Sequence, residues 1–180
     1  MKSAYIVSGL RTAVGKAKKG GFRFVRPDDL AANVIKSLVK KTKGLEGIMV
    51  DDLIVGNAVP EAEQGMQMAR YISLLSLPKE VPGLVINRYC GSGLEAIHLA
   101  CAKINAGSAE CVIAGGTESM SMVPMTGYKS ALNYNISVNN PDYYLNMGLT
   151  AEKLAKKYDI KREDSDLFSF NSHMKATKAI

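Results

Sequence analysis

Cys90 lies between a run of apolar residues, 84–87, and a helical pattern over residues 91–105. At a tight turn from a buried strand into a helix, the free N–H groups and the positive dipole end of the helix favour a thiolate. Gly91 and Gly93 would let the backbone turn sharply and a substrate approach closely. The same N–H groups would stabilise an oxyanion on an acyl group carried by the sulfur. The pattern indicates a nucleophile, with a buried structural cysteine as the alternative.

A thiol nucleophile needs a base, and the chain contains two histidines. His98 follows Cys90 by eight residues, about 12 Å along a helix, which is too far for a hydrogen bond to the sulfur. We expect His98 in the core or at an interface. His173 falls in the last helical pattern, where both a surface and a site role stay open. Either Cys90 is not catalytic or the rest of its site lies beyond Ile180.

Spacing excludes other kinds of chemistry. The run from Gly9 to Lys16 resembles a phosphate-binding loop, but five residues separate its glycines instead of four, and Ala17 replaces the magnesium-binding hydroxyl. The cysteines lack the spacing of metal ligands, so no metal site is expected. Cys101 would lie about 16 Å from Cys90 along one helix, which forbids a disulfide between them. We expect Cys101 and Cys111 to serve packing.

Four short apolar runs, rich in Val and Ile, have the length of buried strands. They are residues 5–8, 53–56, 84–87 and 111–115. Helical patterns over residues 28–43, 64–75 and 91–105 separate them. Asp28 is expected as the N-cap of the first helix and Gly107 as the C′ residue of the third. Strands that alternate with helices predict an α/β fold with a largely parallel or mixed sheet flanked by helices.

The pattern changes after residue 116. Residues 117–149 lack a sustained period and are expected to form long loops over a site or an interface. Two more helices are expected, one over 151–158 with Thr150 as N-cap and one from Arg162 onward. The apolar positions of the last helix continue up to Ile180 without a C-cap. This indicates a chain cut from a longer protein, with a frayed terminal helix as the alternative.

The composition is that of a globular domain, with 180 residues, of which 47% are hydrophobic and 22% charged. It excludes disordered, collagen-like and coiled-coil chains, and no apolar run approaches the roughly 18 residues of a membrane span. Three cysteines and the lack of a secretory signal over residues 1–9 predict a reducing, cytoplasmic location. Much of the net charge of +6 lies in residues 16–26, without interleaved aromatic residues. This favours a solvated surface or a small anionic ligand over nucleic acid.

Five segments resemble, in the correct order, the motifs of thiolases, which join or split acyl chains on coenzyme A. Residues 87–96, Asn-Arg-Tyr-Cys-Gly-Ser-Gly-Leu-Glu-Ala, are similar to the nucleophile segment of that family. The other four segments are residues 8–15, 56–65, 114–121 and 147–152. The resemblance covers nearly the whole chain and is specific, because five separate motifs occur in order.

The resemblance implies a layered α/β/α/β/α fold of two similar halves. Residues 1–116 would be the N-terminal core that carries the nucleophile, and 117–180 the beginning of a substrate-covering loop domain. Cys90 would attack the 3-keto carbonyl of a 3-ketoacyl-CoA, release acetyl-CoA and pass the acyl group to a second coenzyme A. Met147 would lie near the acyl pocket. The family implies acyl-CoA and coenzyme A as partners, a homodimer or homotetramer, and no metal, prosthetic group, nucleic acid or membrane span.

Two departures from the family matter. Thiolases are longer, and their activating histidine, their second cysteine and their Asn-Glu-Ala-Phe segment lie in a second half with no counterpart here. Asn146 stands where the biosynthetic, acetoacetyl-CoA-forming branch has histidine, and together with residues 60–65 it favours the degradative 3-ketoacyl-CoA thiolases. The alternatives are a biosynthetic thiolase, a related condensing enzyme, and, if the natural chain ends at Ile180, a silent coenzyme A-binding or assembly module.

Overall fold

The computed structural model describes residues 3–180, which divide into two compact units, one up to Ser130 and one from Ala131 onward. The strands and Cys90 belong to the first unit, and the second is helical and contains Met147. The functional division expected after residue 116 remains a prediction.

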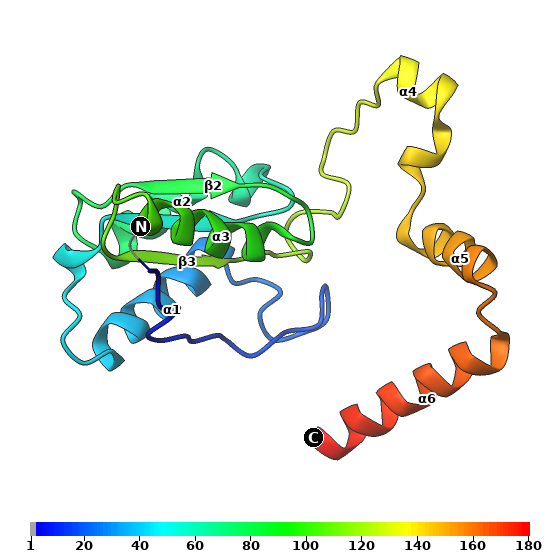
Figure 1. Ribbon diagram of the computed structural model, residues 1–180, viewed down its shortest axis with the longest axis horizontal. Helices are drawn as coiled ribbons and strands as arrows, with labels where there is room; N and C mark the ends of the chain where they lie inside the picture. The colour runs from blue at the N-terminus through cyan, green and yellow to red at the C-terminus, as the bar shows by residue number, and fades with distance from the viewer. Residues whose placement is uncertain (1–2) are drawn as a thin grey trace. The chain divides into compact units, whose positions relative to one another are not determined.

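Three parallel strands form the sheet of the first unit, in the order β2-β1-β3 (Figure 1). They are β1 (Asp52–Gly56), β2 (Gly83–Ile86) and β3 (Val112–Gly116). The second, third and fourth predicted strands are thus confirmed, and in the register Ile54 of β1 pairs with Leu84 and Ala114. All five residues of β1 are buried, as expected for the central strand of a sheet covered on both faces.

The strand predicted over residues 5–8 is wrong, because the structure places this segment outside any strand. Tyr5, Ile6 and Val7 expose 81%, 80% and 83% of their surfaces. An apolar run becomes a strand only when a neighbouring strand supplies ladder hydrogen bonds and another layer covers its side chains. Among the described residues, none pairs with this segment in a sheet.

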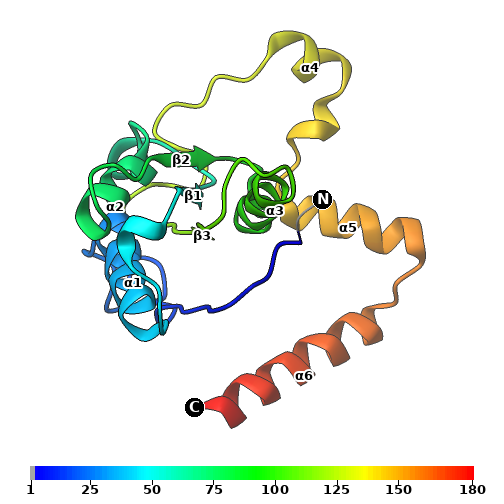
Figure 2. The same cartoon turned by 60° about the vertical axis from the view of Figure 1, so that its left-hand side comes forward.

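Helices cover both faces of the sheet. They are α1 (Pro27–Lys41), α2 (Met68–Ser76) and α3 (Ser92–Asn105). Figure 2 shows α1 and α2 on one side of the strands and α3 on the other. Successive side chains of a strand point to opposite faces: Leu53 and Val55 join the core cluster that contains Ile72 of α2, whereas Ile54 packs with Ala96 of α3. The predicted α/β fold with a sheet flanked by helices is confirmed.

The prediction of Asp28 as the N-cap of the first helix is wrong: the cap lies two residues earlier, and Asp28 has another role. Arg26 occupies the cap position of α1, with Pro27 as the first helical residue. Asp28 is buried, and its carboxylate accepts hydrogen bonds from the Arg26 guanidinium at 2.8 and 3.0 Å. Proline suits the first helical position, since its missing N–H would have no intrahelical partner there.

The second helix begins at Met68, later than the predicted residue 64. A short 3-10 helix, η2 (Ala62–Gln64), precedes it, and Gln67 has a left-handed backbone with φ of +59°. The Gln67 Oε1 accepts a hydrogen bond from the Val85 N–H at 2.9 Å, which ties this segment to β2. The tertiary contact thus replaces the first turn of helix that the periodicity predicts. A further 3-10 helix, η1 (Gly47–Met49), precedes β1.

The end of α3 confirms the predicted role of Gly107. Its φ is +76°, in the left-handed region that favours glycine. The Gly107 N–H donates to the Ile104 carbonyl, and the Ser108 N–H donates to the Lys103 carbonyl, both at 3.0 Å. These paired bonds form a Schellman motif and end the helix.

The second unit contains the two predicted helices, α5 (Met147–Tyr158) and α6 (Arg162–Ala179), and two short elements that the sequence does not predict. The short elements are α4 (Tyr134–Asn139) and η3 (Pro141–Tyr144). The expectation of loops throughout 117–149 is therefore wrong for α4 and η3. The cap assigned to Thr150 is also wrong: Asn146 Oδ1 accepts a hydrogen bond from the Leu149 N–H at 2.9 Å, so α5 begins about one turn earlier. Asparagine ranks above threonine as an N-cap.

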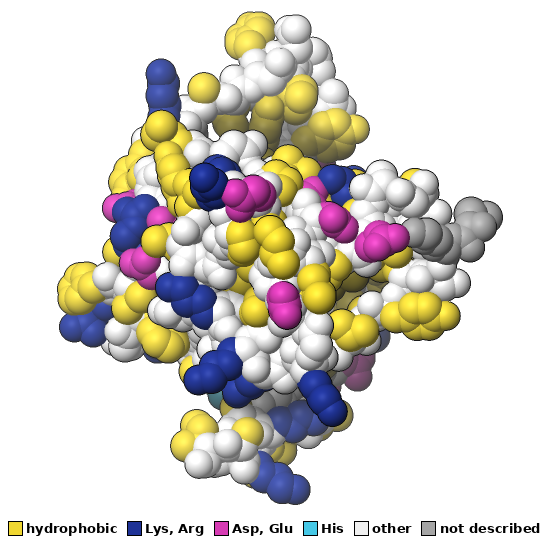
Figure 3. Space-filling model, turned by 90° about the vertical axis from the view of Figure 1, so that its left-hand side faces the viewer, with side chains coloured by type: hydrophobic (Ala, Val, Ile, Leu, Met, Phe, Trp, Pro, Cys, Tyr) yellow, Lys and Arg dark blue, Asp and Glu magenta, His cyan; other side chains and the backbone are white. Residues whose placement is uncertain are grey.

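The surface carries charges of both signs and many apolar side chains. On the face shown in Figure 3, hydrophobic side chains lie among cationic and anionic ones. On α3, Leu94 exposes 74% of its surface and Ile97 is also exposed. No helix within residues 3–180 has both the length and the apolar character that crossing a bilayer requires.

Asp51 connects the beginnings of β1 and β3. Its Oδ2 accepts hydrogen bonds from the N–H groups of Glu110, at 2.6 Å, and Cys111, at 3.0 Å, and these bonds lower the pKa of Asp51. A carboxyl group with a pKa lowered by folding stabilises the protein above its unfolded-state pKa. That contribution is lost as the pH falls through the folded-state pKa.

Asp51→Asn is therefore expected to lower the free energy of unfolding of the intact protein at pH 7 by about 1 kcal/mol. This expected loss is smaller than that usual for hydrogen bonds to a charged group, because water competes for the exposed Asp51 carboxylate. The deficit should shrink below about pH 4, where the wild-type carboxylate begins to lose its charge. Urea unfolding at pH 7 and pH 3 measures it, with Glu80→Gln, an exposed loop carboxylate, as the control. A deficit of equal size at both pH values would contradict the assignment.

Candidate active site

The carboxyl ends of the three parallel strands lie at one edge of the sheet. Asn57 follows β1, Asn87 follows β2 and Thr117 follows β3. The Asn57 N–H donates to the Ile86 carbonyl at 3.0 Å, and the Thr117 N–H donates to the Gly56 carbonyl at 3.2 Å, so the three ends stay together. Parallel α/β sheets bind their ligands outside this edge. The candidate site therefore lies at this edge.

Cys90 lies at this edge, in the turn between β2 and α3, as the sequence predicts. Its side chain is exposed, which differs from the buried position of a packing cysteine. Tyr89, directly before it, has φ of +46°, a left-handed value that is uncommon for a residue other than glycine. Gly91 is the N-cap of α3, so Cys90 directly precedes the cap. The geometry suits a nucleophile, and the catalytic role itself remains a prediction.

Local hydrogen bonds hold the backbone on both sides of Cys90. The Tyr89 N–H donates to Asn87 Oδ1 at 2.8 Å, and the Arg88 N–H donates to Ser92 Oγ at 2.8 Å. The Ser92 hydroxyl donates in turn to the Tyr89 carbonyl at 2.6 Å. Each of these bonds uses a neighbour of Cys90 in the chain, so the turn does not depend on the cysteine sulfur.

Glycines let the first turn of α3 lie directly on the ends of the strands. A Cβ atom on Gly56 would lie 2.4 Å from the carbonyl carbon of Ser92 and 2.7 Å from the nitrogen of Gly93. A Cβ atom on Gly116 would lie 3.0 Å from the Gly56 carbonyl oxygen. Real Cβ atoms essentially never come as close to backbone as at Gly56, whereas the contact at Gly116 is only tight, so the position of Cys90 depends on Gly56.

The carboxylate of Glu118, in the loop after β3, binds two other segments. Its Oε2 accepts a hydrogen bond from the Ala58 N–H at 2.7 Å, and its Oε1 accepts one from Gln64 Nε2 at 2.7 Å. Gln64 is buried, and its Oε1 accepts a bond from the Ser119 N–H at 2.6 Å. Glu118 and Gln64 thus join the loops after β1 and β3 at the edge that carries Cys90.

Sequence reasoning identified Cys90 but did not single out Asn87, Gln64 or Glu118. All three lie within the segments that resemble thiolases, so the information was present without a role for each residue. A usable signal is the polar residue directly after a buried parallel strand, because such residues gather at one edge of the sheet. That signal finds Asn87 alone, since Gln64 and Glu118 lie further along their loops.

The two histidines and the other two cysteines lie in surroundings that differ from those of Cys90. His98 is exposed on α3, so a core position is wrong and an interface position stays a prediction, and His173 is exposed on α6 of the second unit. Cys101 and Cys111 are half-buried free thiols. Burial raises the pKa of Cys111, and the charge of Asp51 adds to the effect. A thiol with a raised pKa is a poor nucleophile at neutral pH, which agrees with the packing role expected for Cys111.

Met147 is the first residue of α5 in the second unit and exposes 72% of its surface there. Its expected place near an acyl pocket remains a prediction. Within residues 3–180, no three or more His, Cys, Asp and Glu side chains are grouped as ligands of a metal ion.

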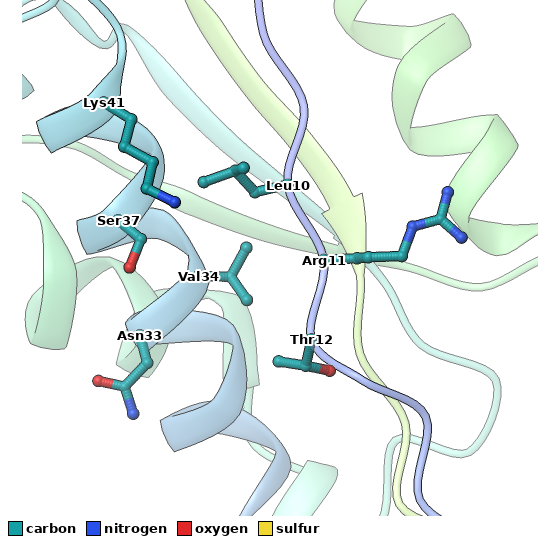
Figure 4. Close-up of a pocket in the computed structure, with 7 residues that line it drawn as sticks. All are labelled: Leu10, Arg11, Thr12, Asn33, Val34, Ser37 and Lys41. Atoms are coloured by element: carbon teal, nitrogen blue, oxygen red, sulfur yellow. The ribbon is translucent and has the colours of Figure 1, made fainter. Parts of the chain in front are cut away.

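A shallow hollow of about 260 Å³ lies between the N-terminal segment and α1 (Figure 4). Its lining residues are Leu10, Arg11, Thr12, Asn33, Val34, Ser37 and Lys41. The Arg11 side chain extends away from α1 in this view. None of the lining residues belongs to the Cys90 turn, so the hollow is separate from the candidate site.

The fold is a parallel α/β sheet with an exposed cysteine between a strand and a covering helix. This arrangement is typical of proteins that use a thiol as a nucleophile. A family model described as "Thiolase, N-terminal domain" matches residues 4–180. The chain therefore belongs to the thiolase family.

Individual relatives bear consistent names. The chain is 53% identical to a "3-ketoacyl-CoA thiolase" of Bacillus subtilis (strain 168), over 100% of this chain and 46% of that protein. It is 40% identical to one of Colwellia psychrerythraea and 39% identical to one of Aliivibrio salmonicida, in each case over 99% of this chain and 46% of that protein. The chain thus spans less than half the length of these curated relatives.

Proposed function

We propose that the intact protein is an acetyl-CoA C-acyltransferase, which cleaves 3-ketoacyl-CoA with coenzyme A through an acyl-cysteine at Cys90. The observation that carries the proposal is the exposed Cys90 at a hydrogen-bonded turn before α3, in a chain of the thiolase family. The name 3-ketoacyl-CoA thiolase, borne by relatives up to 53% identical, supports this substrate class.

In the proposed reaction, the Cys90 thiolate attacks the C3 carbonyl of the substrate. The C2–C3 bond then breaks, and acetyl-CoA leaves as an enolate that takes up a proton. The acyl-cysteine reacts with the thiol of a second coenzyme A, which forms the shortened acyl-CoA and restores the thiolate. N–H groups at the start of α3 would stabilise the oxyanion. Coenzyme A acts as a substrate, and no step uses a metal or a prosthetic group. The proton-transferring residues would lie outside this chain.

The proposal includes the degradative direction and the place of Met147 near the acyl group. Asn146, which stands where biosynthetic thiolases have histidine, is weak support for the degradative direction. Asparagine at this position is already explained by its role as the N-cap of α5. The direction depends instead on residues 60–65 and on the names of the relatives.

We also propose a homodimer or homotetramer in the cytoplasm. The three thiols are free, which suits a reducing compartment. Sedimentation of the intact protein measures the oligomer number. A monomer at micromolar concentration would contradict this part of the proposal.

The test incubates the intact protein with 3-ketoacyl-CoA substrates of several chain lengths, with and without coenzyme A. With coenzyme A, acetyl-CoA and a shortened acyl-CoA should form in equal amounts. Without coenzyme A, the peptide that contains Cys90 should gain the mass of the acyl group. Acylation at another residue would contradict the role of Cys90. Cleavage of acetoacetyl-CoA alone would indicate a biosynthetic thiolase, condensation alone a condensing enzyme, and coenzyme A binding without either reaction a silent module.

A further inference from the structure

We propose that Asn87 is a positioning residue for Cys90, and that Ala58 and Glu118 hold Asn87 in place. The catalytic consequence rests on the proposed function, whereas the geometry does not. Asn87 uses both ends of its side-chain amide: Oδ1 accepts a hydrogen bond from the Tyr89 N–H at 2.8 Å, and Nδ2 donates one to the Ala58 carbonyl at 3.0 Å. The partners determine the orientation of the amide, because an N–H group only donates and a carbonyl only accepts.

The bond to Tyr89 acts where the backbone is least favourable. Tyr89 has φ of +46°, a left-handed conformation that costs free energy for a side chain with a Cβ atom. Such a residue stays in this region only when its surroundings hold it there. Because Tyr89 directly precedes Cys90, relaxation of its φ would move Cys90 relative to the N-terminus of α3.

The bond to Ala58 prevents the amide from moving with the turn. Ala58 is held from the other side, since its N–H donates to Glu118 Oε2 at 2.7 Å. Gln64 Nε2 donates to the second oxygen of Glu118 at 2.7 Å. A continuous path of hydrogen bonds therefore runs from Glu118 through Ala58 and Asn87 to the residue before Cys90.

This path links the nucleophile segment to two segments that the reaction chemistry does not use. Residues 56–65, 87–96 and 114–121 lie at the carboxyl ends of three different strands, and each contributes a group to the path. The sheet brings the segments together, because the carboxyl ends of parallel strands share one edge. The path passes from the loop of β3 through the loop of β1 to the nucleophile turn.

Labelling of the cysteines with iodoacetamide tests the position of Cys90 without any turnover. Peptide mass spectrometry follows Cys90 and, on the same helix, half-buried Cys101 as an internal control. In the intact protein, Asn87→Ala should slow the labelling of Cys90 about tenfold, because the thiolate moves away from the positive end of α3, and should leave Cys101 unchanged. Asn87→Ser should stay within about threefold of the wild type, since a serine hydroxyl also accepts from the N–H two residues on.

Steady-state kinetics provide the second measurement. Asn87→Ala should lower kcat for thiolysis about 10²-fold with KM within about threefold, because a displaced nucleophile affects the chemical step more than binding. Ser108→Ala is the matched control. It removes a side-chain hydrogen bond of 3.0 Å to a backbone carbonyl, that of Lys103, at the opposite end of α3, and it should change neither measurement.

The outcomes separate positioning from stability and from the proposed function. Faster labelling of Cys101 in step with a change at Cys90 would show a structural role for Asn87 and overturn the proposal, as would wild-type labelling of Cys90 in Asn87→Ala. If the wild-type protein cleaves no 3-ketoacyl-CoA, the proposed function fails, and the labelling ratio still tests the position of Cys90. If thiolysis is normal and the ratio does not respond, positioning fails and the function stands.

Glu118→Gln tests the far end of the path. The glutamine side chain has one acceptor oxygen where the Glu118 carboxylate has two. It therefore cannot accept hydrogen bonds from both Ala58 and Gln64 in this geometry, and one of the two bonds is lost. We expect the labelling of Cys90 to slow about threefold, and the double variant with Asn87→Ala to behave like Asn87→Ala alone, because both changes interrupt one path. Independent, multiplicative effects would overturn the role of Glu118.

Discussion

The intact protein with Cys90→Ala is expected to lose 3-ketoacyl-CoA cleavage by about 10³-fold or more and to keep its fold. The loss is large because no covalent intermediate can form without the sulfur. The fold survives because the Cys90 side chain is exposed, so its removal leaves no cavity. The bonds of the turn belong to Asn87, Arg88 and Ser92. Initial rates of acetyl-CoA formation and far-UV circular dichroism measure the two expectations.

Cys101→Ala is the matched control for this experiment. It removes a thiol from the same helix, α3, at a half-buried position, and it should keep kcat within about threefold of the wild type. If Cys90→Ala retained turnover, or if both variants lost it equally, Cys90 would not be the nucleophile and the proposed function would need another residue.

Replacement of Gly56 by alanine is expected to lower the free energy of unfolding by about 3 kcal/mol or more. The added Cβ would lie 2.4 Å and 2.6 Å from the carbonyl carbon and oxygen of Ser92. These are backbone atoms in the first turn of α3, which cannot rotate away as the end of a flexible side chain does. Either β1 or α3 must shift, and overpacking of this kind is among the most destabilising effects of a single methyl group.

Gly115→Ala is the control for Gly56→Ala. Gly115 pairs with Val55 in the neighbouring strand, and no described atom lies within 4 Å of a Cβ built there, apart from its chain neighbours. Urea unfolding of both variants of the intact protein gives the comparison, and Gly115→Ala should stay within about 1 kcal/mol of the wild type. Equal losses at both positions would show that the close approach of α3 to β1 is not what requires glycine at residue 56.

Elements with a complete local signal were predictable from the sequence. The strands β1, β2 and β3 are apolar runs ended by Gly or Asn, and the end of α3 has glycine at its C′ position. The turn that carries Cys90 follows from the same kind of signal, because the strand ends just before it and the helix begins just after it. For these elements, residues close in the chain supply most of the interactions that select the conformation.

Elements whose conformation depends on distant residues were not predictable. Residues 5–8 have the composition of a strand but no described strand beside them, so the same pattern gives no sheet. The helix α2 begins late because Gln67 binds the backbone of β2, 18 residues further along the chain. In each case a tertiary contact, or the lack of one, decides between local alternatives that differ little in free energy.

The candidate site shows the same division. Local patterns suffice to place Cys90 between a strand and a helix, because hydrophobic periodicity and the turn-forming glycines are local properties of residues 84–105. The path from Glu118 through Ala58 to Asn87 depends on contacts between distant parts of the chain. Glu118 lies 60 residues from Ala58 in the chain, and the hydrogen bond between them exists because parallel pairing brings the ends of β1 and β3 to the same edge.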